Sequence, residues 1–262
     1  MFEHLKKIAI LYYLLFPKLF GLGYNQYKIW LIKKILKKKI YKTKNYIDER
    51  IVEIPWVIGH LKSFTNIKIL DAGCTLNHKY LIDEVLLNKN TISFVNLYKE
   101  KFSDSRNSVS YMESDISNLN IENDTYNIVT CISVLEHIGF DNQIYNHSKT
   151  INKNLSINRN LYINGILEIK RVLAKNGVAY LSFPFGLSMS FNNLQQFDMS
   201  DVNKILEAFQ PTSYCIEYYK YWHEQNSWEN VSSIECKNLV PVYHDASTAI
   251  SANSVALLKL CK

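Results

Sequence analysis

The sequence lacks any pairing pattern among its cysteines. Its 262 residues include five cysteines, which are scattered and show no CxxC spacing. An odd and irregular set of this kind argues against a disulfide framework and against a zinc site. Cys74 and Cys131 are expected to pack in apolar surroundings at the ends of strands. These features fit a protein of the reducing cytoplasm.

Long apolar runs are also missing. The run Ile8–Phe16 is too short to span a bilayer, and no small-residue cleavage site of a signal peptide follows it. The chain is 47% hydrophobic and 21% charged, as globular proteins are. Its length fits one large α/β domain with additions.

Positive charge is concentrated in residues 1–46, which contain eleven lysines and one acidic residue. The remaining chain carries 19 basic and 23 acidic residues. The pattern predicts two amphipathic helices, at about 3–16 and 25–41, that form a basic N-terminal extension before a domain spanning 47–262. Three roles for the extension stay open: a helical cover over the sheet or the site, a peripheral contact with anionic lipid, and an arm that binds nucleic acid.

Glycine is scarce in the stretch that organises the chain, residues 66–76 with the sequence NIKILDAGCTL. It predicts a buried strand that ends at Asp71 and a turn at Gly73, followed by a helix over about 78–87. A strand, a glycine turn and a helix form nucleotide sites, because the helix N-terminus supplies spare N–H donors. The usual loop carries two or three glycines, but here Thr75 and Asn77 occupy the later small positions.

Further strands are expected at 91–97, 109–113, 126–133 and 178–183, with a helix at 165–173 before the last of them. Strands that alternate with helices predict a parallel sheet with helices on both faces. The first four strands all end in polar or small residues. We therefore expect the site at their carboxyl ends.

Three segments carry a resemblance to a known family. In order they are DAGC, ESDISNLNIENDTYNIVTCISVLEHIG and EIKRVLAKNGVAYLSFPFG. They resemble successive motifs of class I S-adenosylmethionine-dependent methyltransferases, and within these the small-molecule group with an LEHIG-type segment after the fourth strand. The resemblance covers about residues 48–187 and fits the tail more loosely. It implies an α/β, Rossmann-like, doubly wound sheet of seven mostly parallel strands, with an antiparallel hairpin near 213–221 and 254–260.

The resemblance also implies S-adenosyl-L-methionine as the cofactor and assigns roles to residues around it. Asp71 would orient the methionine part, and Asp115 would accept from the adenine amino group. Asn96 stands where an acid usually holds the ribose, and an amide does so more weakly. The implied cofactor-binding set is Asp71, Ala72, Gly73, Cys74, Asn96, Leu97, Ser114, Asp115, Ile116 and Ser133.

Methyl transfer needs a base only when the acceptor has a high pKa. His137, just after the fourth strand, is the candidate catalytic base, since imidazole titrates near neutrality. The alternative is a histidine that packs the following turn; His147 and His223 are weaker candidates. The polar stretches 139–165 and 184–197 are expected to form substrate or lid loops. No metal site is expected.

These features favour a methyltransferase (EC 2.1.1.-) that O-methylates a small polar acceptor. A sugar or phosphorylated precursor of bacterial surface polysaccharide, as in capsule biosynthesis, is the expected acceptor class, with oligomeric state left open. A nucleic-acid methyltransferase that uses the basic arm is the alternative, but no [ND]PPY-type segment is present to hold a flipped base. A third hypothesis is a non-catalytic binding protein that lost cofactor affinity through Thr75, Asn77 and Asn96.

Overall fold

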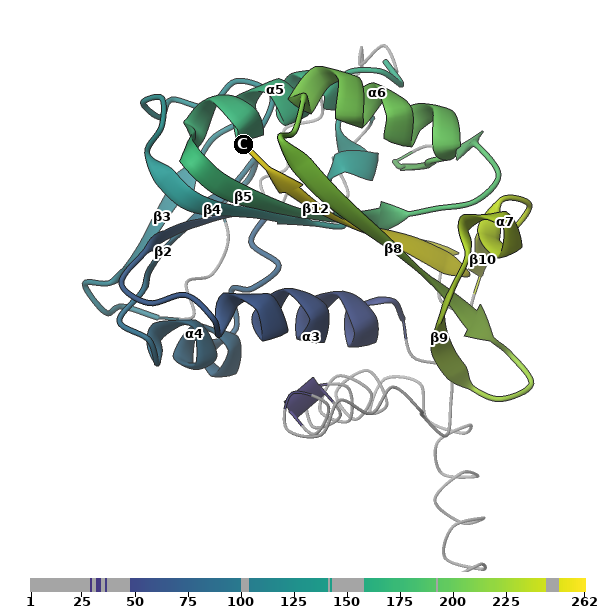
Figure 1. Cartoon of the computed structure of the whole chain (residues 1–262), viewed down its shortest axis with the longest axis horizontal. Coiled ribbons are helices and arrows are strands. Elements are labelled where there is room, and N and C mark those ends of the chain that lie inside the picture. Colours follow the sequence, from purple (N-terminus) through teal and green to yellow (C-terminus); the bar gives the residue numbers. More distant parts are fainter. Residues whose placement is uncertain are drawn as a thin grey trace, which may run out of the picture.

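The computed structural model describes residues 29, 32, 33, 36, 48–99, 104–140, 142, 158–191, 193–243 and 250–262. The two helices expected in the extension lie outside these residues, except for four positions of the second. Most of the stretch 139–165 lies outside them as well. Within the described part, a central twisted sheet is covered by α5 (Tyr162–Val172) and α6 (Met199–Phe209) on one face and by α3 (Arg50–Leu61) and α4 (Lys79–Leu86) on the other (Figure 1).

The sheet has eight strands in the order β3-β2-β1-β4-β5-β12-β8-β9. In chain order they are β1 (Lys68–Ala72), β2 (Thr91–Asn96), β3 (Val109–Glu113), β4 (Tyr126–Ile132), β5 (Leu173–Pro184), β8 (Ser213–Trp222), β9 (Ser227–Val231) and β12 (Ser254–Cys261). The smaller elements are the 3-10 helix η1 (Leu135–His137), the hairpin β6 (Met189–Ser190) and β7 (Gln195–Gln196), α7 (Ser233–Cys236), and the pair β10 (Val242–Tyr243) and β11 (Ile250–Ser251).

The expected topology is confirmed. The first five strands pair in parallel, and β12 runs antiparallel to both β5 and β8. This is the doubly wound sheet with a final antiparallel hairpin that the resemblance implies. One strand was missed, because β9 pairs antiparallel with the end of β8 and brings the sheet to eight strands instead of seven.

The segment 174–177, between the expected helix at 165–173 and the expected strand at 178–183, is an irregularity inside β5. Tyr126 of β4 pairs with Leu173, and the next pair joins Ile128 to Val178, so the chain between the two partners bulges out of register. Asn176 in this bulge has a φ of 62°, which suits an Asn or Gly better than most residues. The strand therefore begins at residue 173, well before the apolar run that predicted it.

Two apolar clusters hold the layers together. One packs α3 and α4 against the sheet through buried side chains such as Trp56, Val57 and Ile82. The other packs α5 and α6 against the opposite face through Ile166, Ile169 and others. Because both faces are covered, the central strands are apolar on both sides, as parallel strands of α/β proteins usually are.

Part of the N-terminal extension contributes to the first cluster. Ile32 is 1% exposed and belongs to this core, and the Lys33 ammonium lies 5.1 Å from the centre of the Tyr80 ring. These contacts place this part of the extension on the α3 and α4 side of the sheet. Within the described residues, no helix has the length and apolarity needed to cross a membrane.

Candidate active site

The pocket of interest opens at the carboxyl ends of β1 to β4. Strand order reverses between β1 and β4, since the chain continues from β1 to β2 and β3 on one side and then returns to β4 on the other. Ligands of doubly wound sheets bind at such a point. Here a pocket of about 400 Å³ is lined by Gly73, Asn96, Leu97, Asp115, Ile116, Ser133 and His137, all from the predicted set, together with nine other residues.

The loop after β1 is held by its own side chains. Gly73 and Cys74 both have positive φ, 106° and 60°, and the Gly73 N–H donates to the Val95 carbonyl of β2 at 2.7 Å. The Thr75 hydroxyl donates to the Ile132 carbonyl at the end of β4, at 2.9 Å. These bonds tie the loop to both neighbouring strands and leave the Gly73 backbone on the pocket wall.

Asp71 supports this loop from beneath. Its carboxylate is fully buried and accepts from the Leu76 N–H and the Thr130 hydroxyl, both at 2.7 Å. It does not line the pocket, and neither do Ala72, Cys74 and Ser114. In this structure Asp71 shapes the loop through hydrogen bonds, and its direct role toward a cofactor stays a prediction.

The wall formed by β2 and β3 carries polar groups that suit a nucleoside. Asn96 ends β2, and its side-chain oxygen accepts from the Leu97 N–H at 3.0 Å. Asp115 follows β3, and one of its oxygens accepts from both the N–H and the hydroxyl of Ser117, at 2.8 and 2.7 Å. Together with the buried Ile116, these residues combine hydrogen-bonding groups with an apolar contact.

Arg50 brings a cation to the opposite wall, a group that the sequence motifs did not predict. Its guanidinium donates to the buried Glu53 carboxylate at 2.6 Å, and the other Glu53 oxygen accepts from the Ser133 hydroxyl at 2.6 Å. A helix before the sheet is thus joined to the end of β4, where Ser133 has a φ of 46°. Arg50 is the one cationic side chain on the pocket wall among the described residues.

Two further carboxyl groups lie near this ion pair and have raised pKa values. Burial, together with the charges of Asp48 and Glu53, raises the pKa of Glu49 to about 7. Burial likewise raises the pKa of Glu136 well above its usual value, and its Oε2 atom has no hydrogen-bond partner among the described residues. A desolvated carboxyl keeps its proton more readily than one in water, so Glu136 releases its proton at a higher pH than a carboxyl in solution does.

His137 lies on the pocket wall in η1, directly after Glu136. Its Nδ1 atom is 2.7 Å from the Asn193 carbonyl oxygen of the β6–β7 hairpin. A carbonyl oxygen only accepts, so Nδ1 carries the proton and the lone pair of the neutral ring lies on Nε2. Burial lowers the pKa of His137 to about 4, and the nearby Arg50 charge acts in the same direction. The ring is neutral at physiological pH.

Nine further lining residues were not named individually from the sequence. They come from separate segments of the chain and comprise Arg50, Thr75, Tyr98, Val134, Ile138, Gly139, Phe140, Asn142 and Leu161. The last four of them lie in the stretch 139–165 that was expected to form a substrate or lid loop, and the LEHIG-type motif was the signal for Ile138 and Gly139. Nothing in the local sequence marked Arg50, which reaches the site only through packing.

The comparisons with known proteins reveal likeness in fold. No protein-family model and no curated protein sequence matches the chain. A search of solved structures finds a Burkholderia thailandensis 1,6-didemethyltoxoflavin N1-methyltransferase with a TM-score of 0.49 and 11% identity, covering 80% of this chain and 78% of the other. It also finds an S-adenosylmethionine-dependent methyltransferase from Mesorhizobium loti with a TM-score of 0.46 and 8% identity, covering 80% and 98%.

A third similar structure is the [4+2]-cyclase SpnF, with a TM-score of 0.47 and 10% identity, covering 90% of this chain and 94% of the other. At these identities the likeness concerns the arrangement of sheet and helices and gives this chain no activity. One fold hosts many reactions, so a function must be argued from the pocket itself.

Proposed function

We propose that the protein is an S-adenosylmethionine-dependent methyltransferase that acts on a small polar acceptor. The observation that carries the proposal is the pocket at the carboxyl ends of β1 to β4. Seven of the eleven residues expected at the site line this pocket. Its volume of about 400 Å³ lies in the range of small-molecule sites.

The chemistry of the lining residues fits the parts of this cofactor. Asp115 and Asn96 offer acceptors for the adenine amino group and the ribose hydroxyls. The Gly73 backbone lines the pocket and packs closely on Val134, since a Cβ atom at Gly73 would lie 2.1 Å from a Val134 methyl group. Arg50 holds Glu53 through one nitrogen of its guanidinium, and its remaining N–H donors would bind the α-carboxylate of the methionine part.

The residues act mainly by position. Bound S-adenosylmethionine supplies a methyl group on a sulfonium, which leaves by in-line displacement on carbon. The pocket must hold the acceptor atom in line with that bond, a contribution that depends on rigid walls. The loop after β1, tied to β2 and β4, and the Arg50–Glu53–Ser133 bridge supply such rigidity.

His137 is proposed to accept the proton of the acceptor group. Its Nδ1 proton is engaged by Asn193, so Nε2 is the nitrogen with a lone pair. Because the pKa of His137 is lowered to about 4 by burial, the ring is in the accepting form throughout the neutral range. A base this weak contributes less to proton removal than one titrating near 7, and its main role is to orient the acceptor hydroxyl.

O-methylation of a sugar or phosphorylated precursor of bacterial surface polysaccharide stays the finer part of the proposal and rests on the resemblance. The pocket favours the sugar within that class. Its one cationic lining residue among the described residues, Arg50, is already paired with Glu53. A phosphate would require further cations, whereas hydroxyl groups match the neutral His137 and Asn142.

Calorimetric titration with S-adenosylhomocysteine tests the proposal. We expect saturable binding by the wild-type chain, and weaker binding after Arg50→Met, which removes the cation and keeps most of the side-chain length. Lys204→Met, on the surface of α6, is the matched control and should bind as the wild type does. Absence of binding by the wild-type chain would overturn the cofactor assignment. Positive binding would justify a screen of sugar acceptors for methyl transfer.

A further inference from the structure

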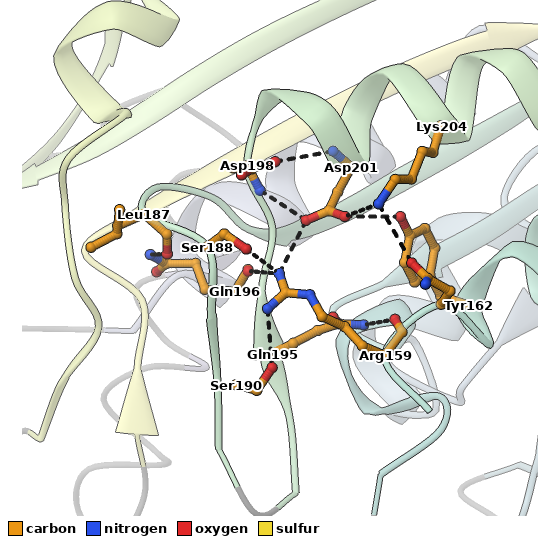
Figure 2. A network of polar contacts seen from close by, with 11 residues as sticks. Arg159, Tyr162, Leu187, Ser188, Ser190, Gln195, Gln196, Asp198, Asp201 and Lys204 are labelled. Atoms are coloured by element: carbon orange, nitrogen blue, oxygen red, sulfur yellow. Dashed lines mark hydrogen bonds and ion pairs between the residues drawn. The ribbon is translucent and has the colours of Figure 1, made fainter. Parts of the chain in front are cut away.

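A polar network around the β6–β7 hairpin and the start of α6 consists of residues that do not line the cofactor pocket (Figure 2). At its centre is Arg159, just before α5. The guanidinium donates to the Ser190 hydroxyl at 3.0 Å and to the Gln196 carbonyl at 3.2 Å, one on each strand of the β6–β7 hairpin. It also donates to the Ser188 hydroxyl, and the Arg159 carbonyl accepts from the Gln195 side chain at 2.9 Å. Arg159 thus donates hydrogen bonds to both strands of the hairpin.

The same guanidinium group of Arg159 is also anchored to a rigid element. Its guanidinium lies 3.2 Å from an Asp201 oxygen, and Asp201 is 2% exposed in the first turn of α6. Asp201 forms a capping box with Asp198 and accepts from the Tyr162 hydroxyl at 3.1 Å. A capping box satisfies backbone donors at the helix start, so this carboxylate is fixed in place. The hairpin is therefore joined through Arg159 to the helix layer.

The tip of the same hairpin reaches the candidate base. Asn193 lies between the two strands, and its carbonyl oxygen is 2.7 Å from His137 Nδ1. The open end of the hairpin has further bonds, because the Gln196 side-chain amide donates to the Leu187 and Leu239 carbonyls. Arg159 contacts both strands, at Ser190 of β6 and at Gln196 of β7. A shift of the hairpin would move Asn193 away from the imidazole.

We propose that Arg159 is a positioning residue, which clamps the β6–β7 hairpin to α6 so that the Asn193 carbonyl holds His137 as the Nδ1–H tautomer. The hydrogen bond of the second ring nitrogen sets which nitrogen carries the proton, and the clamp fixes the atom that makes this bond. The contribution to turnover rests on the proposed function. The effect on the tautomer does not, because it is measured without cofactor or acceptor.

The test is NMR of the full chain labelled with ¹⁵N-histidine, near neutral pH. The chain has seven histidines, and the signals that disappear in His137→Gln identify those of His137. We expect a protonated Nδ1 and an unprotonated Nε2 in the wild type. Arg159→Met should replace this single tautomer with an exchange-averaged mixture. Lys204→Met, which removes a second cation from Asp201 without touching the hairpin, should keep the wild-type signals.

A second variant tests the same proposal in case Arg159→Met does not fold. The double substitution Ser188→Ala and Ser190→Ala removes hydroxyl contacts of the hairpin with Arg159 and leaves the ion pair with Asp201. It should shift the tautomer in the same direction. In a methyl-transfer assay, both variants should lose turnover, by roughly 10²-fold if the imidazole is misplaced by about 1 Å, while S-adenosylhomocysteine affinity stays unchanged.

Three results would overturn the proposal. They are an Nε2–H tautomer in the wild type, a wild-type tautomer in both Arg159→Met and the double serine variant, or a change of tautomer in Lys204→Met equal to that in Arg159→Met. If the tautomer responds as expected but the wild type neither binds S-adenosylhomocysteine nor transfers methyl groups, the proposed function fails and the clamp stands. If binding and transfer are normal but the tautomer is insensitive, the clamp fails and the function stands.

Discussion

Gly73→Ala is the substitution that tests the architecture of the pocket most directly. Gly73 has a φ of +106°, a conformation that L side chains rarely adopt. A Cβ atom there would lie 2.1 Å from Val134 Cγ2 and 3.1 Å from both Val134 Cβ and Cγ1. Because three atoms of one side chain are involved, rotation of the valine alone cannot remove the overlap. The loop after β1 and the residue after β4 must move apart.

The expected cost has two parts. A non-glycine residue in such a backbone conformation costs about 1–3 kcal/mol, and forcing a methyl group into a packed site costs about 1–3 kcal/mol. Together they remove about 2–6 kcal/mol from a free energy of unfolding that is typically about 5–15 kcal/mol for a domain. The variant should remain folded in the cold, with a clearly lower urea midpoint.

The two parts can be separated with Val134→Ala. The double variant Gly73→Ala with Val134→Ala lacks the two valine methyl groups that the new Cβ atom would meet, and it keeps the backbone strain and the 3.1 Å contact with the Cβ atom of residue 134. A double-mutant cycle should therefore show a favourable coupling of about 1–3 kcal/mol, the steric part alone. Cofactor affinity should follow the same pattern, since both residues line the pocket.

Urea unfolding measures the stability and calorimetry with S-adenosylhomocysteine measures the affinity. Gly59→Ala is the matched control, because Gly59 is in α3 and a Cβ atom added there would meet nothing within 4 Å among the described residues beyond its own helix. Replacing a glycine inside a helix should stabilise the protein by about 0.5–1 kcal/mol. If Gly73→Ala behaves like Gly59→Ala, the described geometry of the loop after β1 is wrong.

Three further predictions concern titratable groups of the site. Asp115→Ala should weaken S-adenosylhomocysteine binding by about 1–3 kcal/mol, the cost of an unpaired donor, whereas Glu207→Ala on the exposed side of α6 should leave it unchanged; equal affinities would remove Asp115 from the adenine site. For His137 the pKa falls from 6.5 to about 4 on folding because of burial, so the unfolded chain binds the extra proton, and this group makes stability rise with pH between about 4 and 6.5. In His137→Gln the free energy of unfolding should rise by about 3 kcal/mol less over this pH range than in the wild type, as measured by urea titrations at several pH values. An unaltered dependence on pH would contradict the neutral buried ring. For Glu136 burial raises the pKa, so the folded state keeps a proton that the unfolded chain releases above about pH 4.5, and stability falls as pH rises. Glu136→Gln should remove this loss and should thus gain stability relative to the wild type as the pH rises above about 4.5; a difference in stability that does not change with pH would contradict the raised pKa of Glu136.

The apolar periodicity and the polar strand ends were enough to predict the central sheet. β3 was predicted at its observed bounds, and β1, β2 and β4 to within about two residues. The reason is that buried parallel strands are short apolar runs with turn residues on both sides, which is a local signal. β9 was missed because it pairs only with the end of β8, where aromatic and polar residues are mixed. The start of β5 was missed because its first residues form a bulge.

The missing parts of the site depend on contacts between distant residues. Arg50 reaches the carbonyl of Ile132, 82 residues along the chain, and His137 meets the Asn193 carbonyl 56 residues away. Neither partner is marked by its neighbours in sequence, since a backbone carbonyl carries no side-chain signal. The motif after β4 therefore predicted the histidine, but its tautomer follows from the Asn193 carbonyl of the β6–β7 hairpin and its low pKa follows from burial.

The departures from a glycine-rich loop after β1 have a physical explanation. Glycine serves in such loops by adopting positive φ and by letting the backbone approach a ligand. Here Gly73 has a positive φ and lines the pocket, while Cys74 adopts a φ of 60° without being glycine. Thr75 and Asn77 instead use their side chains: the Thr75 hydroxyl donates to the Ile132 carbonyl, and the Asn77 side-chain oxygen accepts from the Tyr111 hydroxyl at 3.0 Å.

The same side-chain bonds bear on whether the cofactor site is intact. Asp71 adds a further tie, since its carboxylate accepts the Leu76 N–H from beneath the loop. A loop held in this way loses less conformational entropy when a ligand binds than a run of glycines would. Thr75 and Asn77 therefore argue for a preorganised loop, and they give no support to the hypothesis of a fold that has lost its cofactor.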